Sequence, residues 1–587
     1  MARRRGIVIV LSMFGLVLLA FVGGVATLAF IASRGPSIPD EATLVLRPQG
    51  SLQEVVPNDL VGQLLGRDTD TIGALVNTLR LAKRDERVQR VLLMPANLDV
   101  PYWGKLQELR EAVLDFRSAG KSVVAFLEYG ADREYYLASA ADQIYLLPTS
   151  PLDLTGVASY ELFLRGLLDK VGATPDFIGV GAYKTAPNQL TERGMTPAHR
   201  EMAESLNRDL YDQLVRGIAE GRKKSEADVR ALLDEGPFAP DAALRAGLVD
   251  GLAYEDELDD HVPDLRDDDD ERRITGATYR RVPPGAVGIR PRTKIAVLYA
   301  VGTIVAGRSG FDPLNGDVIG SDTLVEQIRR VRDDETIEAI VLRVDSPGGS
   351  AVASDIIWRE LMITRRANPD RPLVTSMSDL AASGGYYLAM AGQAIVAQPA
   401  TLTGSIGIYG GKVALGGAAD KLGVNTETVK SGANADIYSP FAPFSPAQRE
   451  KLLAFMQSFY DGFVEKAAES RGLTPAAVDA VAQGRVWTGA QARTHGLVDE
   501  LGGLAVAVRL AKERAGIPAD EEVELVAYPP RRTLLEVLSQ ELGGGRATGL
   551  TALLAGQRDV LMRAGAPRGG LFRRGEPLAL MPTALAW

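Results

Sequence analysis

The chain contains no cysteine and only three histidines among its 587 residues. Disulfides, thiolate nucleophiles and cysteine-ligated metals are therefore excluded. His199, His261 and His495 form no metal-binding pattern, and each has polar or charged neighbours typical of a surface. The net charge of −10 is accompanied by no basic stripe interleaved with aromatic residues, which argues against nucleic acid as a partner.

One long hydrophobic run is present, and it lies at the N-terminus. Three arginines at positions 3–5 precede an apolar run over residues 6–32 that is interrupted only by Ser12 and Thr27. This run is long enough to span a hydrocarbon core of about 30 Å and exceeds the apolar region of about 7–15 residues in a cleavable signal. We expect residues 1–33 to form a retained single-pass anchor in the cell inner membrane, with the rest of the chain on the periplasmic side. Cleavage near Ala32-Ser33 is the alternative and leaves the same domains on the same side.

The remainder of the chain reads as one α/β domain present twice. The tetrapeptide Tyr-Tyr-Leu-Ala occurs at residues 135–138 and again at 386–389. In each half a helix-like stretch (71–81; 323–331) precedes an apolar strand (88–93; 337–342), and a second strand follows a long helix (122–127; 372–377). This alternation predicts α/β architecture with largely parallel strands. We place the domains at residues 40–262 and 292–525, a charged, proline-containing linker at 263–291, and a tail of unknown role at 526–587.

The two copies differ in the residues that could carry chemistry. Ser383, in Ala-Ser-Gly-Gly, aligns with Asp132 of the first copy, whereas Lys184 aligns with Ala435 of the second. We expect Ser383 to follow an apolar strand and a short loop and to precede a helix. The amides and dipole at the start of that helix would favour negative charge beside the hydroxyl. A plain helix N-cap is the alternative role for this serine.

A second turn in the same half has the composition of an oxyanion hole. The apolar strand at 341–344 runs into Asp345-Ser346-Pro347-Gly348-Gly349 and then into a helix. Glycines there present bare N–H groups with no side chain in the way, and Gly384 N–H can supply a second donor. An ordinary tight turn is the alternative. The first copy has no glycine at the corresponding residues 96–100.

A serine hydroxyl needs a base, and no histidine lies in a recognisable catalytic motif. A lysine can serve when burial lowers its pKa toward neutrality. Lys184 follows a largely apolar strand at 175–180 and is the candidate, with a surface lysine as the alternative. A lysine base requires neither a metal nor an organic cofactor.

Four motifs carry a resemblance to a known family. They are Tyr183-Lys184-Thr185-Ala186, Asp345-Ser346-Pro347-Gly348-Gly349, Ala381-Ala382-Ser383-Gly384-Gly385-Tyr386 and Thr401-Leu402-Thr403-Gly404-Ser405-Ile406-Gly407. Over about residues 40–525 the chain resembles the long two-domain form of the signal peptide peptidase A family, Ser/Lys-dyad serine proteases. The resemblance implies tandem Clp/crotonase-like domains, Ser383 as nucleophile, Lys184 as base, Ser405 orienting the lysine, and Gly349 and Gly384 as oxyanion donors. Thr185 stands where serine is usual.

The resemblance also implies an activity and partners. We expect a membrane-anchored serine endopeptidase that cleaves remnant signal peptides and other extended peptides through an acyl-enzyme. It implies a homotetramer that contacts lipid through its N-terminal helix and uses no cofactor. Two alternatives are an acyl-CoA enzyme of the crotonase type, which shares the fold and the oxyanion turn, and a non-catalytic membrane scaffold built on a decayed protease.

Overall fold

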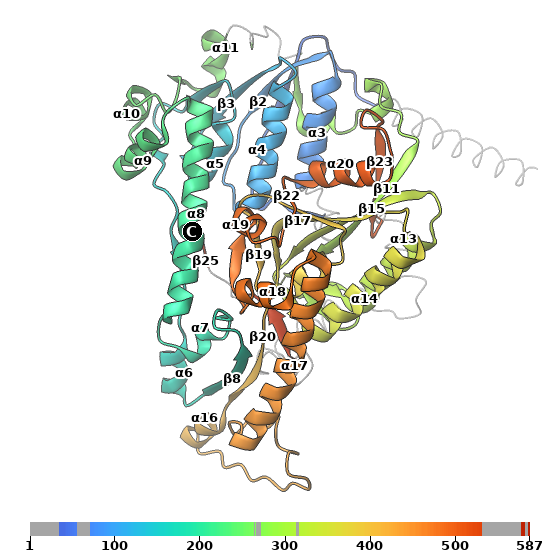
Figure 1. Ribbon diagram of the computed structural model, residues 1–587. Helices are drawn as coiled ribbons and strands as arrows, with labels where there is room; N and C mark the ends of the chain where they lie inside the picture. The colour runs from blue at the N-terminus through green and yellow to red at the C-terminus, as the bar shows by residue number, and fades with distance from the viewer. Residues whose placement is uncertain are drawn as a thin grey trace, which may run out of the picture.

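The computed structural model describes residues 35–55, 71–262, 265, 272–312, 316–530, 577–581 and 585–586. The expected membrane anchor at residues 1–33 lies outside these ranges. Within them, no helix is both long and apolar enough to cross a bilayer. In Figure 1 most of the first half forms the upper part of the molecule and most of the second half lies below it. The long helix α8 (Pro197–Arg222) runs down one side, and other elements of the first half lie at its lower end.

The first half is built on a six-stranded parallel sheet in the order β10-β1-β2-β3-β5-β9. Its strands are β1 (Ala42–Leu46), β2 (Val88–Leu93), β3 (Ser122–Leu127), β5 (Gln143–Leu146), β9 (Gly251–Leu252) and β10 (Arg273–Thr275). The main helices beside it are α3 (Ile72–Arg84), α4 (Gly104–Arg117) and α5 (Asp132–Ala138). The strands predicted at 88–93 and 122–127 are therefore present as β2 and β3.

The segment assigned to the linker is partly a component of the first half. Residues 273–275 form the edge strand β10, in which Ile274 is buried and pairs with Leu44. The short helix α12 (Gly276–Tyr279) follows, and the Tyr279 hydroxyl donates to Asp85 at 3.0 Å. The sequence did not predict this strand, because Ile274 is its one apolar residue and finds its apolar partners only in the folded sheet.

The second half contains an eight-stranded sheet whose main path is β21-β19-β17-β15-β11-β23, with β18 beside β17 and β22 beside β18. Its strands are β11 (Thr293–Val301), β15 (Ile337–Ser346), β17 (Leu373–Ala382), β18 (Ala394–Ala397), β19 (Leu402–Gly404), β21 (Val486–Thr488), β22 (Glu500–Leu501) and β23 (Val523–Tyr528). Helices beside it include α13 (Ser321–Asp333), α14 (Ala351–Ala367), α15 (Gly384–Ala389), α17 (Pro446–Arg471) and α20 (Leu504–Arg514).

Strand β17 is longer than its sequence predicts. It continues to Ala382, so the short loop expected before Ser383 does not exist. The prediction was wrong because Ser376, Ser378 and Asp379 interrupt the apolar pattern, yet all three are buried. Their polar groups are satisfied by partners that include residues of the first half, which sequence periodicity cannot reveal.

Equivalent polar contacts recur in the two halves. The Tyr135 hydroxyl donates to the Leu248 carbonyl, as the Tyr386 hydroxyl does to the Leu497 carbonyl. An arginine–aspartate pair then recurs at equivalent positions, with Arg222 and Asp250 in the first half matching Arg471 and Asp499 in the second. The repeat thus extends to side-chain contacts as well as to the order of elements.

A third sheet joins both halves and the tail, in the order β13-β14-β12-β16-β24-β20-β8. Its strands are β8 (Thr174–Val180), β12 (Thr303–Val305), β13 (Gly310–Asp312), β14 (Gly316–Gly320), β16 (Gly348–Ser350), β20 (Ile408–Ala414) and β24 (Leu578–Leu580). Strand β8 of the first half pairs antiparallel with β20 of the second along its whole length. This pairing carries the residues that follow β8, including Lys184, into the second half.

Candidate active site

Ser383 lies at the junction between β17 and α15. Its backbone has φ 56° and ψ −113°, a region that a non-glycine residue rarely adopts. The Ser383 amide donates to the Gly404 carbonyl at 2.8 Å, which holds this conformation against β19. Strain of this kind is concentrated at functional positions. The Ser383 side chain is completely buried.

Lys184 reaches this serine from the other half of the chain. Its Nζ lies 2.7 Å from Ser383 Oγ and 3.0 Å from both the carbonyl oxygen and the hydroxyl of Ser405. The backbone is brought close by Gly484, where an added Cβ would lie 2.5 Å from the Lys184 amide nitrogen. Tyr183 N also donates to the Gln483 carbonyl at 2.8 Å.

Ser405 is positioned by the end of β19, a neighbour of β17 in the sheet. It too has a positive φ, 50°, and its amide donates to the Arg485 carbonyl at 2.7 Å. The structure thus brings Ser383, Lys184 and Ser405 into one buried cluster. Ser383 and Ser405 come from neighbouring strands and Lys184 from the first half.

The electrostatic surroundings of Lys184 favour its neutral form. Burial holds the pKa of Lys184 well below its usual range, since desolvation disfavours the ammonium. Its three hydrogen-bonding neighbours are uncharged oxygens. A neutral amine in contact with a serine hydroxyl can accept that hydroxyl proton.

The two glycine turns abut each other beside this cluster. Gly348 and Gly349 have φ values of 99° and 155°, and Ser346 Oγ accepts a hydrogen bond from the Gly348 amide at 3.2 Å. A Cβ built on Gly348 would lie 2.7 Å from the Gly384 amide nitrogen. The sequence predicts the amides of Gly349 and Gly384 as two donors of an oxyanion hole, and the two turns that carry these amides are in contact.

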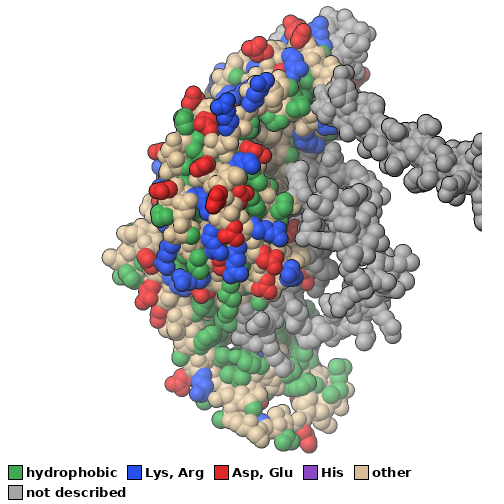
Figure 2. Space-filling model, turned by 90° about the vertical axis from the view of Figure 1, so that its right-hand side faces the viewer, with side chains coloured by type: hydrophobic (Ala, Val, Ile, Leu, Met, Phe, Trp, Pro, Cys, Tyr) green, Lys and Arg blue, Asp and Glu red, His purple; other side chains and the backbone are tan. Residues whose placement is uncertain are grey.

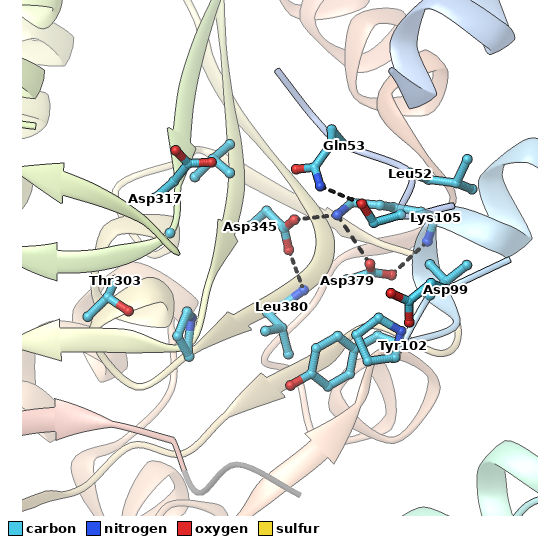
Figure 3. Close-up of a pocket in the computed structure, with 16 residues that line it drawn as sticks. Leu52, Gln53, Asp99, Tyr102, Lys105, Thr303, Asp317, Asp345, Asp379 and Leu380 are labelled. Carbon is cyan, nitrogen blue, oxygen red and sulfur yellow. Dashed lines mark hydrogen bonds and ion pairs between the residues drawn. The ribbon is translucent and has the colours of Figure 1, made fainter. Parts of the chain in front are cut away.

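A buried ion cluster supports the first of these turns, and sequence reasoning missed it. Lys105, on α4 of the first half, points between Asp345 and Asp379 (Figure 3), with its Nζ 2.6 Å and 3.3 Å from their carboxylates. Asp345 also accepts from the Leu380 amide at 3.1 Å. The available signal was the occurrence of aspartates in two otherwise buried strands, since buried carboxylates require partners.

These groups line a pocket between the halves with a volume of about 280 Å³. Tyr102 and Leu380 border it, and Asp99 and Asp317 add further acidic groups (Figure 3). Pro347, the residue before the two turn glycines, lies on its wall. The pocket thus opens directly beside the oxyanion-type turn.

Among the described residues of the first half, the position equivalent to Ser383 carries no second copy of the cluster. Asp132, which aligns with Ser383, accepts hydrogen bonds from the amides of Thr155 and Gly156 in its own half. Burial raises the pKa of this carboxyl. The position equivalent to Ser383 is therefore occupied by a carboxylate that accepts backbone hydrogen bonds within the first half.

One expectation about the histidines was wrong. His199 is almost fully buried rather than on the surface, and its Nε2 lies 2.7 Å from a carboxylate oxygen of Glu161. The polar neighbours of His199 in sequence lie on other faces of α8, which misled the prediction. Across the part of the chain that the structure describes, no group of His, Asp and Glu side chains has the arrangement of a metal site.

Comparison with known proteins gives consistent matches. A family model described as "Peptidase family S49" matches residues 115–267 and again residues 365–518, once in each half. The chloroplastic serine protease SPPA of Arabidopsis thaliana is 34% identical over 78% of this chain and 68% of its own length. Protease 4 of Salmonella typhi is 33% identical over 82% of this chain and 78% of its own. Protease 4 of Haemophilus influenzae is 30% identical over 83% and 79%, respectively.

Proposed function

This chain belongs to peptidase family S49 and is a serine protease, and we propose that it works through a dyad of Ser383 and Lys184. The observation that carries the proposal is the 2.7 Å contact between Lys184 Nζ and Ser383 Oγ in a buried cluster. Ser383 is the nucleophile and Lys184 the general base in this proposal. Because each half supplies one of the two residues, neither half alone would be active.

The neighbours of Lys184 set the direction of proton transfer. A neutral amine has two N–H groups and one lone pair. The Ser405 carbonyl can only accept, so it takes one N–H, and Ser405 Oγ takes the other. The lone pair is then left for the Ser383 hydroxyl, which donates to it. Ser405 is therefore a positioning residue that orients the base.

The reaction follows from this arrangement. Lys184 takes the proton of Ser383 as Oγ attacks the scissile carbonyl, and the amides of Gly349 and Gly384 bind the developing oxyanion. Lys184 then protonates the leaving amine. A water molecule, deprotonated by the same lysine, hydrolyses the acyl-enzyme and restores Ser383.

The substrate and location are further parts of the proposal. The resemblance to signal peptide peptidases supports extended peptides, remnant signal peptides among them, as substrates. The hydrophobic run at 6–32 supports single-pass anchoring in the inner membrane, with the catalytic halves on the periplasmic side.

A homotetramer is proposed on the same resemblance and on the surface of the lower end of the molecule. In Figure 2 apolar side chains gather there, whereas charged ones dominate above. Four exposed apolar residues lie on or near the helices at this end of the molecule (Figure 1), which are α6 (Arg165–Val171), α16 (Gly416–Lys421) and α17. They are Leu167, Leu422, Val424 and Phe455. Apolar patches of this kind mark interaction surfaces. Mass measurement of the detergent-solubilised chain tests the number of subunits.

Membership of a peptidase family disfavours both alternatives, an acyl-CoA enzyme and a non-catalytic scaffold. Binding of coenzyme A to the purified chain would support the acyl-CoA enzyme. Unchanged function after replacement of Ser383 would support the non-catalytic scaffold.

The dyad is tested with the full chain in detergent and a signal-peptide or casein substrate. Ser383→Ala and Lys184→Ala are each expected to reduce kcat by at least about 10³-fold. Matched controls are Ser458→Ala and Lys451→Ala, which alter exposed residues of α17 and should retain activity. Thermal unfolding of all four variants separates loss of chemistry from loss of fold.

The outcomes distinguish the roles. Substantial hydrolysis by either dyad variant, with the controls active, contradicts the assignment of that residue. Extraction of the parent chain only with detergent, together with its protection from protease added to intact cells, supports the proposed membrane location.

A further inference from the structure

One loop of the second half contacts both sides of the candidate base. It comprises residues 482–485, which lead into β21. The Gln483 carbonyl accepts a hydrogen bond from the amide of Tyr183, which directly precedes the base, at 2.8 Å. The Arg485 carbonyl accepts one from the Ser405 amide at 2.7 Å. The 482–485 loop therefore binds the backbone beside the base and the backbone of the residue that orients it.

The middle of this loop is packed against the base. Gly484 has a φ of 78°, and a Cβ built there would lie 2.5 Å from the Lys184 amide nitrogen and 2.6 Å from its Cα. The Gly484 amide donates to the Ile406 carbonyl at 2.8 Å, next to Ser405. Only a residue without a side chain fits between the two segments. The 3.0 Å distance from Lys184 Nζ to Ser405 Oγ consequently depends on where the loop lies.

The side chain of Arg485 fastens the loop to the first half. Its Nη1 donates to Glu201 Oε1, on α8, at 2.7 Å. Its guanidinium also lies over the ring of Tyr183, with its central carbon 4.7 Å from the ring centroid. The Tyr183 hydroxyl donates to the other carboxylate oxygen of Glu201 at 2.9 Å. The side chains of Tyr183, Glu201 and Arg485 thus form a closed triangle, which we call the Arg485 clamp.

The clamp reaches the orienting serine through a second ring. The Arg485 guanidinium lies 4.3 Å from the ring centroid of Trp487. Trp487 belongs to β21 and pairs with Thr403 of β19. A Cβ built on Gly404, the residue before Ser405, would lie 3.0 Å from the Cδ1 atom of Trp487. One guanidinium therefore contacts a ring that directly precedes the base and a ring packed beside the turn of its orienting serine.

The contacts of Arg485 suit orientation more than stability. The Arg485 side chain is 17% exposed but that of Glu201 is 56% exposed, and ion pairs with an exposed partner contribute little to stability. A guanidinium is planar and rigid, so it fixes the direction of the groups that stack on it and bond to it. A lysine side chain in its place would lack this plane. Loss of Arg485 should therefore loosen the geometry around the base before it unfolds the chain.

We propose that Arg485 is a positioning residue for the base. Its side chain holds Tyr183 and its carbonyl holds Ser405, so that one residue fixes groups on both sides of Lys184. This inference rests on the proposed dyad and names a group that sets its geometry. Arg485 acts through these neighbours and takes no part in bond making. The proton transfers of the proposed reaction are unchanged by this role.

The experiment compares variants of the full chain in detergent, with a signal-peptide substrate. Arg485→Met removes both the charge and the plane, whereas Arg485→Lys retains the charge alone. Glu201→Ala removes the exposed carboxylate that both other members of the clamp bind. Arg80→Met is the matched control. Arg80, on α3, also joins the two halves, through an ion pair with Glu522 at 2.7 Å, and lies outside the candidate site.

We expect Arg485→Met to lower kcat by about 10–100-fold and to change KM less than about twofold, since a small misplacement of the base slows the chemical step. The rising limb of the pH profile of kcat should move to higher pH, because a loosened cluster admits water, which favours the ammonium form of Lys184. Arg485→Lys should recover part of kcat. Glu201→Ala should show a smaller loss with the same direction of pH shift, and the Arg80→Met control should match the parent.

A double-mutant cycle tests whether Arg485 acts through Tyr183. Tyr183→Phe removes the hydroxyl that binds Glu201 and keeps the ring. In the parent chain it should lower kcat severalfold. In the Arg485→Met chain it should have little further effect, because the clamp is already open. Additive losses would contradict the clamp.

Crystal structures of the parent and of Arg485→Met provide a readout that does not need activity. We expect the distance from Lys184 Nζ to Ser405 Oγ to exceed the hydrogen-bonding range in the variant. An unchanged distance, or a loss of kcat without movement of the pH limb, would overturn the proposal. Absence of hydrolysis by every chain, the parent included, would count against the dyad mechanism, and the distance alone would then decide the positioning role. Should Arg485→Met fail to fold, Glu201→Ala carries the same comparison at an exposed site.

Discussion

Lys184 and Lys105 are two buried lysines that the first half contributes to the second, and their surroundings are electrostatically opposite. Lys184 contacts only hydroxyl and carbonyl oxygens. Lys105 contacts the carboxylates of Asp345 and Asp379. Burial alone would lower the pKa of Lys105, but these carboxylates raise it above its usual value, whereas burial lowers the pKa of Lys184 unopposed. The surroundings of Lys184 thus favour its neutral form, whereas those of Lys105 favour its ammonium form.

The pH dependence of activity should report the neutral base. Because burial lowers the pKa of Lys184, its active form accumulates as pH rises through that lowered value, which lies below the ordinary lysine pKa of about 10.4. We expect kcat/KM to increase with pH on this limb. Steady-state kinetics between pH 5 and 10 check this, and a profile that is flat across the range would contradict it.

The same pKa shift predicts a pH-dependent stability difference for Lys184→Met. Between the lowered pKa and about 10.4, the unfolded chain binds a proton at Lys184 that the folded chain does not. The parent therefore gains stability relative to the variant as pH rises through this window, and the gain ends near pH 10.4. Denaturant midpoints of both proteins at several pH values measure it, and parallel curves would show that Lys184 is charged in the folded protein.

Replacement of Ser405 should impair the orientation of the base. Ser405→Ala removes the hydroxyl 3.0 Å from Lys184 Nζ and is expected to lower kcat by up to about 10²-fold with little change in KM. Ser405→Gly removes the same hydroxyl while relaxing the positive φ, so an equal loss assigns the effect to the hydroxyl. A purely structural role would leave the pH profile of kcat unmoved, whereas an orienting role shifts it.

Loss of Lys105 should destabilise the chain and disturb the turn at Gly349. Lys105→Met leaves two buried carboxylates without a cation, a change that typically costs about 3–5 kcal/mol. The control Lys83→Met breaks a surface pair with Asp115 and should cost less than about 1 kcal/mol. Burial raises the pKa of Asp345 even in the parent, so the variant should recover stability relative to the parent as pH falls. Denaturant midpoints at pH 5 and pH 8 test this order.

Arg343 should be equally important to the contact between the halves. It is buried, and its guanidinium donates to Glu54 at 2.7 Å and to Glu108 at 2.6 Å, both from the first half. Arg343→Met leaves these buried carboxylates without a cation and should lower the free energy of unfolding by about 3–5 kcal/mol. Arg200→Met, at an exposed site on α8, should have little effect. Equal unfolding midpoints would show that the buried pair contributes nothing net.

Local patterns in the sequence predicted much of the fold. The apolar runs at 88–93 and 122–127 are strands, and the repeated Tyr-Tyr-Leu-Ala segments are α5 and α15. Such elements are readable because side-chain periodicity reflects local geometry and burial. The end of β17 was missed because its buried polar residues are satisfied by partners distant in the sequence. Strand β10 was missed because its one buried apolar residue, Ile274, pairs with a strand that is far away in the sequence.

The residues of the candidate site differed in how far the sequence predicted them. Ser383 and the glycines stand in compact motifs, so composition and spacing pointed to them. Lys105 has no motif, and its significance depends on two aspartates that lie more than 200 positions away. Its role could not be read locally, because an ion pair is a property of the folded interior.

The sequence by itself determined the duplication, the separation of serine and lysine between the copies, and the glycine turns. Each of these can be recognised from short segments of consecutive residues. Only the tertiary structure decided that Lys184 Nζ lies 2.7 Å from Ser383 Oγ, because pairing of β8 with β20 spans the two halves. It also decided that Ala579 lies opposite Gly349. A strand pairs through backbone groups that every sequence possesses, so its partner is selected by the edges left open in the assembled fold.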